Sequence, residues 1–145
     1  MKIEGLEPDE GLLMWMPVSF AGSAGTSARG AFSLRPAKVR RDAVDAWASA
    51  ADACGFPFVG GDMVMGISDQ RRIHVWRPQF LLARPGHHRG WFPCGRVAQV
   101  GVTRHGAAVR MTMLIDDGTL VGVESMRSRR LRRLASLVSS HAPDR

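Results

Sequence analysis

The side chains of this sequence that could perform acid–base chemistry are few and scattered. Asp116 and Asp117 form the one adjacent acidic pair that follows the N-terminal segment. An acid–base enzyme needs two titratable groups within reach of one substrate. These aspartates precede Gly118, however, and Asp is favoured in tight turns because its side chain bonds to the backbone two residues on. We therefore interpret the pair as part of a turn, with a catalytic role as the alternative.

Cysteine and histidine also lack the spacing of a metal or redox site. Cys54 and Cys94 have no CxxC or Cys/His pattern around them, so we expect two buried free thiols. The five histidines include one adjacent pair, His87 and His88, whose side chains would point to opposite faces of a strand. We expect no metal, no cofactor, no nucleophile with a positioned base and no small-molecule substrate, and hence no enzyme.

Arginine and the aromatic residues are the remaining candidates for function. The chain has 20 basic and 13 acidic residues, a net charge of +7, and 18 of the basic residues are Arg. Asn and Tyr are absent, which is typical of a GC-rich genome whose codons favour Arg, so composition alone is weak evidence for an anionic partner. The distribution is uneven nonetheless. Residues 1–10 form an acidic segment with four acids and one Lys, whereas residues 71–110 carry eight Arg and no acid.

Two segments could recognise a partner. Phe80, Leu81 and Leu82 form an apolar group that could contact a protein, a second copy of the chain, or the interface of a membrane. Four arginines near the C-terminus surround an apolar stripe, and they are candidates for contact with an anionic membrane or a phosphate backbone: Arg129, Arg130, Arg132 and Arg133. The alternative is that these four side chains stay in water.

Basic residues between 71 and 96 are interleaved with aromatic ones. In a nucleic-acid reader these aromatics would stack on bases. In the alternative, Trp76, Trp91 and Phe92 fill the core of a small sheet protein. We expect the second role, so nucleic acid ranks below protein and membrane as a partner.

The length of 145 residues predicts a single domain, residues 1–145. Its 45% hydrophobic and 23% charged residues exclude a largely disordered chain and a polytopic membrane protein. The uncharged stretch 11–28 is too weakly apolar to span a bilayer, and the acidic residues before it do not fit a signal peptide. We expect a cytoplasmic protein, either free or peripheral at the inner face of the membrane.

Two helices and seven strands are predicted. The apolar run 12–20 reads as the first strand, and Pro17 places it at an edge or a bulge. A helix follows over 36–54, and its packed face is expected to hold Val39, Ala43, Ala46, Trp47, Ala50 and Cys54. Six short strands without an intervening helix indicate an antiparallel sheet over 63–125, at 63–67, 72–77, 90–93, 97–103, 107–115 and 120–125.

The last hairpin and the last helix carry the most specific predictions. A three-residue loop with Gly118 in the left-handed conformation pairs Met113 with Val121 and sets Arg110 across from Glu124. The closing helix spans 128–140, with an apolar stripe toward the core and its arginines in water. On that basis Arg130→Glu should change the free energy of unfolding by less than about 1 kcal/mol.

Three phrases of the sequence resemble those of the bacterial pleckstrin-homology-like (PH-like) domains. Residues 66–76 resemble the strand pair that this family joins by a polar turn, residues 91–100 are similar to its Ile-Pro-Leu step, and residues 117–120 look like its Asp-Gly-Ser hairpin. The resemblance covers about 63–140 and implies an α+β, mainly antiparallel fold. That fold is a seven-stranded barrel or pair of orthogonal sheets, closed by a C-terminal amphipathic helix and with a helix inserted after the first strand.

The resemblance does not fix the function, because this scaffold serves lipid binding, peptide binding and assembly. We expect a noncatalytic interaction module that recognises a protein partner or associates with itself. Peripheral binding to an anionic membrane through the arginine-rich surface is the first alternative, and nucleic-acid binding is the second.

Overall fold

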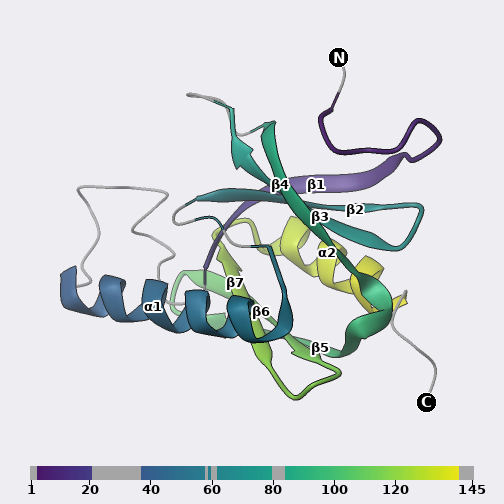
Figure 1. Cartoon of the computed structure of the whole chain (residues 1–145). Coiled ribbons are helices and arrows are strands. Elements are labelled where there is room, and N and C mark those ends of the chain that lie inside the picture. Colours follow the sequence, from purple (N-terminus) through teal and green to yellow (C-terminus); the bar gives the residue numbers. More distant parts are fainter. Residues whose placement is uncertain (1–2, 21–36, 58, 60–61, 80–83, 141–145) are drawn as a thin grey trace.

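The computed structural model describes residues 3–20, 37–57, 59, 62–79 and 84–140, with the backbone alone at 20 and 37–44. These described residues form seven strands and two α-helices, which Figure 1 labels. In chain order they are β1 (Leu12–Phe20), α1 (Ala37–Cys54), β2 (Met63–Ser68), β3 (Arg72–Pro78), β4 (Pro85–Pro93), the short 3-10 helix η2 (Cys94–Arg96), β5 (Val97–His105), β6 (Ala108–Ile115), β7 (Leu120–Ser125) and α2 (Ser128–Ser140).

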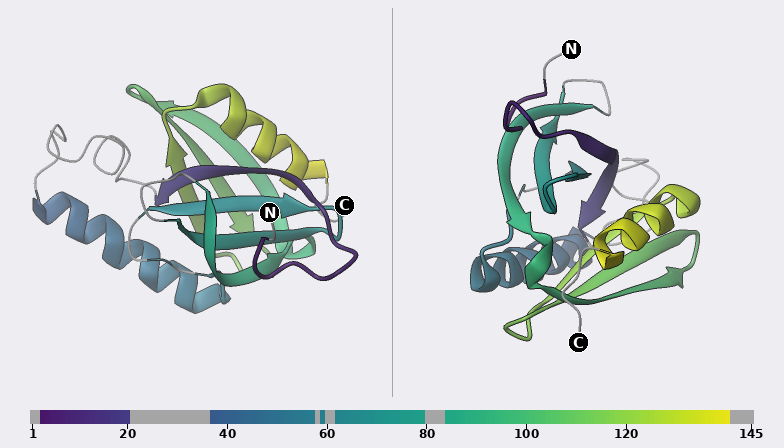
Figure 2. Two further views of the ribbon diagram at one scale, coloured as in Figure 1. Left: turned by 90° about the horizontal axis from the view of Figure 1, so that it is seen from above. Right: turned by 90° about the vertical axis from the view of Figure 1, so that its right-hand side faces the viewer.

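All strand pairs are antiparallel, and the order in the sheet is β4-β3-β2-β1-β7-β6-β5. β1 pairs with β2 from Leu12 to Val18, but it pairs with β7 only at Ser19 and Phe20. The sheet therefore has two halves that share β1, and Figures 1 and 2 show these halves turned across each other. The α+β, antiparallel prediction is confirmed, whereas β4 and β5 end the sheet without pairing, so the described strands form no closed barrel.

The predicted element boundaries agree with the structure except at β4. This strand begins at Pro85, five residues before the predicted start at Gly90. Pro85 lies opposite Pro78, and the pairing of β3 with β4 shifts register twice on either side of Trp76. Proline and glycine usually mark loops, so their presence in residues 85–90 concealed the first half of the strand.

The core lies between the two halves of the sheet. β6 shows the alternation of a half-buried strand, with Val109, Met111, Met113 and Ile115 buried. α1 joins this core through Trp47, Ala51 and Cys54, and the Trp47 indole donates a hydrogen bond to the Gly122 carbonyl of β7 at 2.9 Å. The predicted packed face of α1 is partly wrong, because Ala46 is exposed and Ala51 takes its place; the side chains of Val39 and Ala43 lie outside the described residues.

Pro17 does not lie on an edge strand, contrary to the prediction, because β1 is the fourth of seven strands. The proline is tolerated because the pairing of β1 with β7 involves only the last two residues of the strand. At Pro17 the strand is paired with β2, opposite Val64, and its other side carries no ladder. A residue without an N–H therefore interrupts no pairing on that side.

The hairpin between β6 and β7 has the predicted register. Met113 lies opposite Val121, and Arg110 lies opposite Glu124. Gly118 has φ = 90°, the left-handed conformation expected of the three-residue loop. Arg110 Nε donates to the buried Glu124 carboxylate at 2.7 Å, so the pair lies on the face predicted for it.

Gly118→Ala should lower the free energy of unfolding by about 1 kcal/mol, because an L side chain is strained in the left-handed region. The cost is conformational, since nothing lies within 4 Å of the position that a Cβ would take. Gly101→Ala in β5 is the matched control, with equally open space and no positive φ. Urea unfolding of both variants measures the difference, and an equal effect of the two would contradict the loop assignment.

α2 contacts strands of both halves of the sheet, and its predicted span, 128–140, is confirmed. Its apolar stripe is buried as expected, with Leu131, Leu134, Ala135 and Val138 at most 5% exposed. One of its arginines departs from the prediction. Arg130 is half-buried, and its Nη2 donates to the Trp15 carbonyl of β1 at 2.6 Å. Trp15 lies in the part of β1 that β7 does not pair, so the guanidinium bonds to the strand where its ladder is missing.

The expected stability effect at Arg130 is therefore larger than the sequence predicts. Arg130→Ala should lower the free energy of unfolding by about 1–2 kcal/mol, because it removes a charged donor from a partly buried carbonyl. Arg129→Ala is the control, since Arg129 is exposed and should change stability by less than about 0.5 kcal/mol. Equal effects in thermal or urea unfolding would show that the bond to Trp15 contributes nothing.

Candidate functional site

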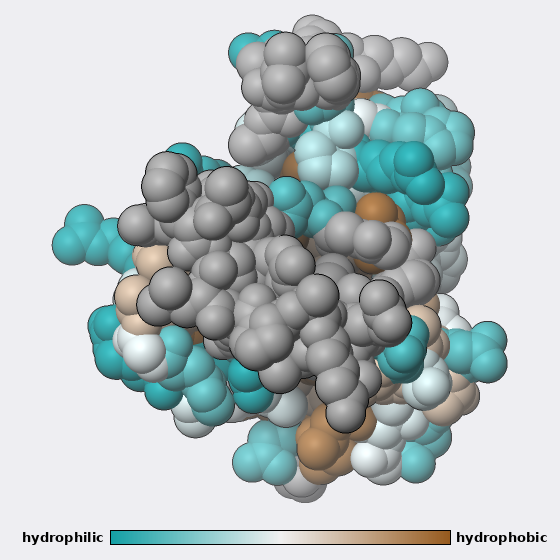
Figure 3. All heavy atoms as spheres, turned by 90° about the vertical axis from the view of Figure 1, so that its left-hand side faces the viewer, coloured by the Kyte–Doolittle hydropathy of each residue, from teal (hydrophilic) through white to brown (hydrophobic). Residues whose placement is uncertain are grey.

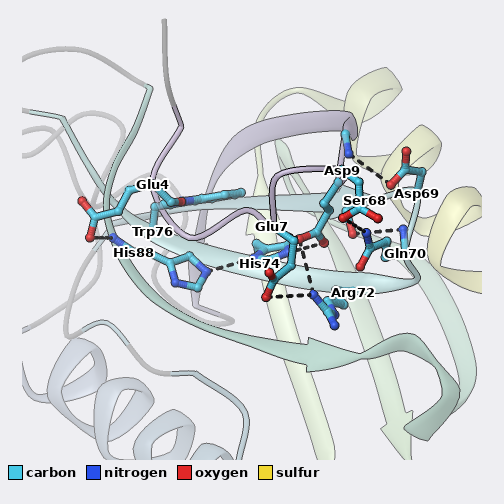
Figure 4. A network of polar contacts seen from close by, with 12 residues as sticks. Glu4, Glu7, Asp9, Ser68, Asp69, Gln70, Arg72, His74, Trp76 and His88 are labelled. Carbon is cyan, nitrogen blue, oxygen red and sulfur yellow. Dashed lines mark hydrogen bonds and ion pairs between the residues drawn. The ribbon is translucent and has the colours of Figure 1, made fainter.

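Two strands of the sheet are buried on both faces, which is unusual for an antiparallel sheet. All six residues of β2 and four consecutive residues of β3 are buried. Ile73 and Val75 face the core, whereas His74 and Trp76 alternate with them and face outward. Residues 3–11, which we call the N-terminal strap, cover this outer face of β2 and β3, as the contacts in Figure 4 show.

A chain of three titratable side chains lies under the strap (Figure 4). Glu10 Oε2 is 2.8 Å from His74 Nε2, and both side chains are fully buried. On the other side of the ring, His74 Nδ1 is 2.9 Å from His88 Nε2. Because β3 and β4 are neighbours in the sheet, the two imidazoles meet across the strands, and the strap brings the carboxylate to them.

The strap is held to the sheet by side chains rather than by a strand ladder. The Trp76 indole donates to the Glu4 carbonyl at 2.7 Å, and Gln70 donates its amide to Asp9 at 3.0 Å. Two glycines permit this fit. A Cβ on Gly5, which has φ = 91°, would lie 2.2 Å from the His88 ring, and a Cβ on Gly66 would lie 3.0 Å from the Trp76 ring.

Burial alone would raise the pKa of Glu10, but its hydrogen bonds reverse this effect. Donors from Ser68, His74 and the Glu7 backbone stabilise the carboxylate and lower its pKa to about 2. Arg72 adds a cation, with Nη1 3.5 Å from Glu10 Oε1. The carboxylate is therefore ionised and fully paired at neutral pH, although it is inside the protein.

These bonds attach the strap to the outer face of the sheet. Ser68 is the one hydroxyl group described at the carboxylate, and it is fully buried and bonds to Glu10. The sequence does not predict the cluster, because Glu10 and His74 are 64 residues apart. The charge distribution could have indicated this contact, because an acidic segment at 1–10 and a basic region at 71–110 attract each other.

The four predicted arginines of α2 do not behave alike. Arg129, Arg132 and Arg133 are exposed, whereas Arg130 is bound to β1. Arg127, just before the helix, is also exposed. Within the residues that the structure describes, the side chains of the four exposed arginines form no ion pair. These four are Arg127, Arg129, Arg132 and Arg133.

The predicted partner contact, Phe80, Leu81 and Leu82, lies outside the described residues. The aromatic residues near it take two different roles. Phe92 lies in the core, as expected, whereas Trp76 is buried on the outer face of β3, under the strap. Trp91 is not a core residue, contrary to the expectation, because it is 45% exposed and the Arg72 guanidinium lies 4.4 Å from its ring centre. Its position on β4, opposite His74, turns it to the outer face of the sheet.

The acidic pair at the hairpin has a role in the turn. Asp117 accepts a hydrogen bond from the Thr119 backbone at 2.9 Å. Its pKa is lowered first by hydrogen bonding to the Thr119 side chain and then by this backbone bond. Asp116 pairs with Arg96 at 3.0 Å. Cys54 and Cys94 are buried free thiols, as predicted, and burial raises the pKa of Cys94 to about 11, so it is not a reactive thiolate.

Among the described residues, no group of three or more His, Cys, Asp or Glu side chains is arranged to hold a metal ion. Neither described helix has the length and apolar character needed to cross a membrane. No protein-family model and no curated protein matches the chain.

Glu10→Gln should lower the free energy of unfolding by about 3 kcal/mol at pH 7, the equivalent of moving a carboxylate pKa from 4.5 to about 2. Because the folded-state pKa lies below the unfolded value, this stabilisation is present above pH 4.5 and is lost as the pH falls toward 2. Urea unfolding at pH 7 and pH 3 should show a smaller difference from the wild type at the lower pH.

Glu7→Gln serves as the control, because the Glu7 side chain is 59% exposed and lies 4.0 Å from Arg72. It should change stability by less than about 0.5 kcal/mol at either pH. A Glu10→Gln effect that does not depend on pH would contradict the ionised, paired state of Glu10.

Proposed function

We propose that the chain is a noncatalytic interaction module of the PH-like type, and that it binds an extended acidic segment of a protein partner. The segment would lie along the free edge of β5, beside α2. The observation that carries this proposal is a group of exposed arginines on and just before α2, a helix that packs against β5. These arginines form no ion pair within the described residues: Arg127, Arg129, Arg132 and Arg133.

Three other arginines of the chain pair with carboxylates, whereas Arg77, Arg84, Arg89 and Arg104 are exposed on or beside the strands. Arg72 pairs with Glu10, Arg96 with Asp116 and Arg110 with Glu124. These pairs account for part of the basic composition, but the helix from 128 to 140 contains no acidic residue at all. Arginine is favoured at protein interfaces because its planar group binds carboxylates through two hydrogen bonds.

The two edges of the sheet differ in their capacity to accept another strand. β4 begins and ends with proline, and its pairing is irregular on either side of Trp76. Proline and bulges are the usual protection of an edge. β5 contains no proline, and its pairing with β6 is regular from Gln99 to His105. The β5 edge is therefore better suited to strand addition.

The side chains along β5 indicate what such a segment would contain. Val100 and Val102 pack against the core but remain half-buried, whereas Gln99, Gly101 and Thr103 are exposed. A partner strand with apolar residues on one face would complete the burial of the two valines. Acidic residues on the same face, beyond the two valines, would meet the arginines of α2. Self-association by this edge is less favourable. It would bring together two chains that each have a net charge of +7, with their basic helices close to each other.

Binding to an anionic membrane remains the alternative, and it would depend on charge alone. The apolar residues of α2 are buried, so the helix has no apolar face to insert into a bilayer. The large apolar side chains exposed in the described part, Leu13, Trp91 and Leu120, come from three different strands. Among the coloured atoms of Figure 3, hydrophilic residues predominate on the face that it presents.

The test is an NMR titration of the whole chain with a short extended peptide in which a Val-rich middle is flanked by Glu, and with its counterpart in which Lys replaces Glu. The acidic peptide should shift the amide signals of residues 99–105 and of α2, and the basic peptide should not. Arg129→Ala combined with Arg133→Ala should weaken binding about tenfold, the effect of losing roughly 1.4 kcal/mol.

Arg77→Ala combined with Arg89→Ala is the matched control, since it removes the same charge from exposed positions on β3 and β4. Vesicles with anionic lipid and a single-stranded oligonucleotide are titrated in parallel. Binding to either of these in preference to the peptide, or peptide shifts confined to other strands, would overturn the proposal.

A further inference from the structure

The contact between His74 and His88 limits how many protons the pair can hold. Their facing nitrogens are 2.9 Å apart, so one nitrogen must carry the proton and the other must accept it. Two protonated rings would turn two N–H groups toward each other at this distance. In the observed geometry the pair therefore accepts at most one proton beyond its neutral form.

The strap confines both rings to this geometry. His74 is fixed on its other side by the Glu10 carboxylate at 2.8 Å, and the backbone of Gly5 lies against the His88 ring. If the strap leaves the sheet, both imidazoles meet water and can rotate apart. Each can then take its own proton, so the released state binds up to one proton more than the docked state.

We propose that the N-terminal strap is an acid-sensitive latch: it is docked over β2 and β3 at neutral pH and is released when both His74 and His88 are protonated. By linkage, the state that binds more protons is favoured as the pH falls. Stability of the docked strap is therefore full above the ordinary titration range of histidine, near pH 6.5, and decreases below it. The equilibrium constant for opening of the strap should rise by up to about tenfold for each unit by which the pH falls, which is the limit for the uptake of one proton.

The charged groups around the pair oppose each other. Glu4 and Glu10 of the strap raise the pKa of His88, but burial and the adjacent His74 and His87 lower it, and the net direction is downward. Arg72 of β3 adds a further cation at 3.5 Å from Glu10. Glu7 contacts Arg72. Asp9 is bound to Gln70 and Asp69 to the Gly11 backbone, and in Figure 4 both lie on the opposite side of His74 from His88.

The strap is also the kind of segment that opens before the rest of the fold. Its two large apolar residues, Ile3 and Leu6, are only half-buried, and its other contacts are polar or ionic. Segments with few buried apolar contacts open at a lower free energy than the global unfolding of the protein. Release would expose Trp76 and His74 beside the already exposed Trp91 and so create an aromatic, cationic face on the sheet.

The experiment is amide hydrogen exchange of the whole chain between pH 7.5 and pH 5, corrected for the intrinsic pH dependence of exchange. Protection of the strap amides should fall below about pH 6.5, while that of β5, β6 and β7 stays constant. Nitrogen-15 spectra of the imidazoles follow the protonation of His74 and His88 in the same samples. The second proton of the pair should appear together with the loss of strap protection.

His88→Gln keeps a hydrogen-bond donor for His74 but removes one titrating group, so strap protection should no longer depend on pH in this range. His105→Gln is the matched control, because His105 is exposed and contacts only Thr103 in the described residues. Gly5→Ala should release the strap at every pH and thereby provide the signal of the open state.

Two results would overturn the proposal. One is full protonation of both imidazoles in the wild type while the strap amides remain protected. The other is a loss of strap protection that occurs only together with that of β5, β6 and β7, since this would be global unfolding.

Discussion

β1 serves both halves of the sheet, and the arrangement of the other elements depends on this sharing. Its residues from Leu12 to Val18, except Leu13 at a register shift, pair with β2, and only its last two residues pair with β7. The strand can therefore turn from one half into the other. The cost is a stretch of backbone around Trp15 and Pro17 that has no ladder on one side. Proline removes one N–H from this stretch, and Arg130 supplies a donor for the Trp15 carbonyl. α2 is thus placed by polar bonding to β1 as well as by its apolar stripe.

A second constraint follows from the outward face of β2 and β3. Trp76 and His74 occupy positions that face solvent in an antiparallel sheet with one buried face, and the strap must cover them without adding a strand. A buried histidine needs partners for both ring nitrogens, which Glu10 and His88 provide. In turn, Glu10 can stay ionised inside the protein only because His74, Ser68 and the Glu7 backbone bond to it. The N-terminal strap and the outer face of β2 and β3 therefore stabilise each other.

Local patterns in the sequence predict the elements well and the long-range contacts poorly. Alternation around Met111 and Met113, together with the turn chemistry of Gly118, was sufficient to select the register of the last hairpin. The 3.6-residue spacing of Leu131, Leu134 and Val138 was sufficient to define α2. By contrast, no local pattern distinguishes Arg130, which bonds to β1, from Arg129, which is exposed. Glu10 and His74 meet only because of the strand order, and a hydrophobic pattern does not encode which strand becomes central.

The distinction between paired and unpaired arginines bears on the meaning of the basic composition. A GC-rich codon preference would raise the number of arginines everywhere on the surface, with or without acidic neighbours. In the described part of the chain, Arg72, Arg96 and Arg110 pair with carboxylates, whereas α2 combines several exposed arginines with a complete lack of acids. Its first turn also has no acidic residue, although the helix dipole would favour one there. The exposed charge of α2 therefore lies beside the regular, proline-free edge of β5, and this position, rather than the number of arginines, is what supports the proposed binding of an acidic segment.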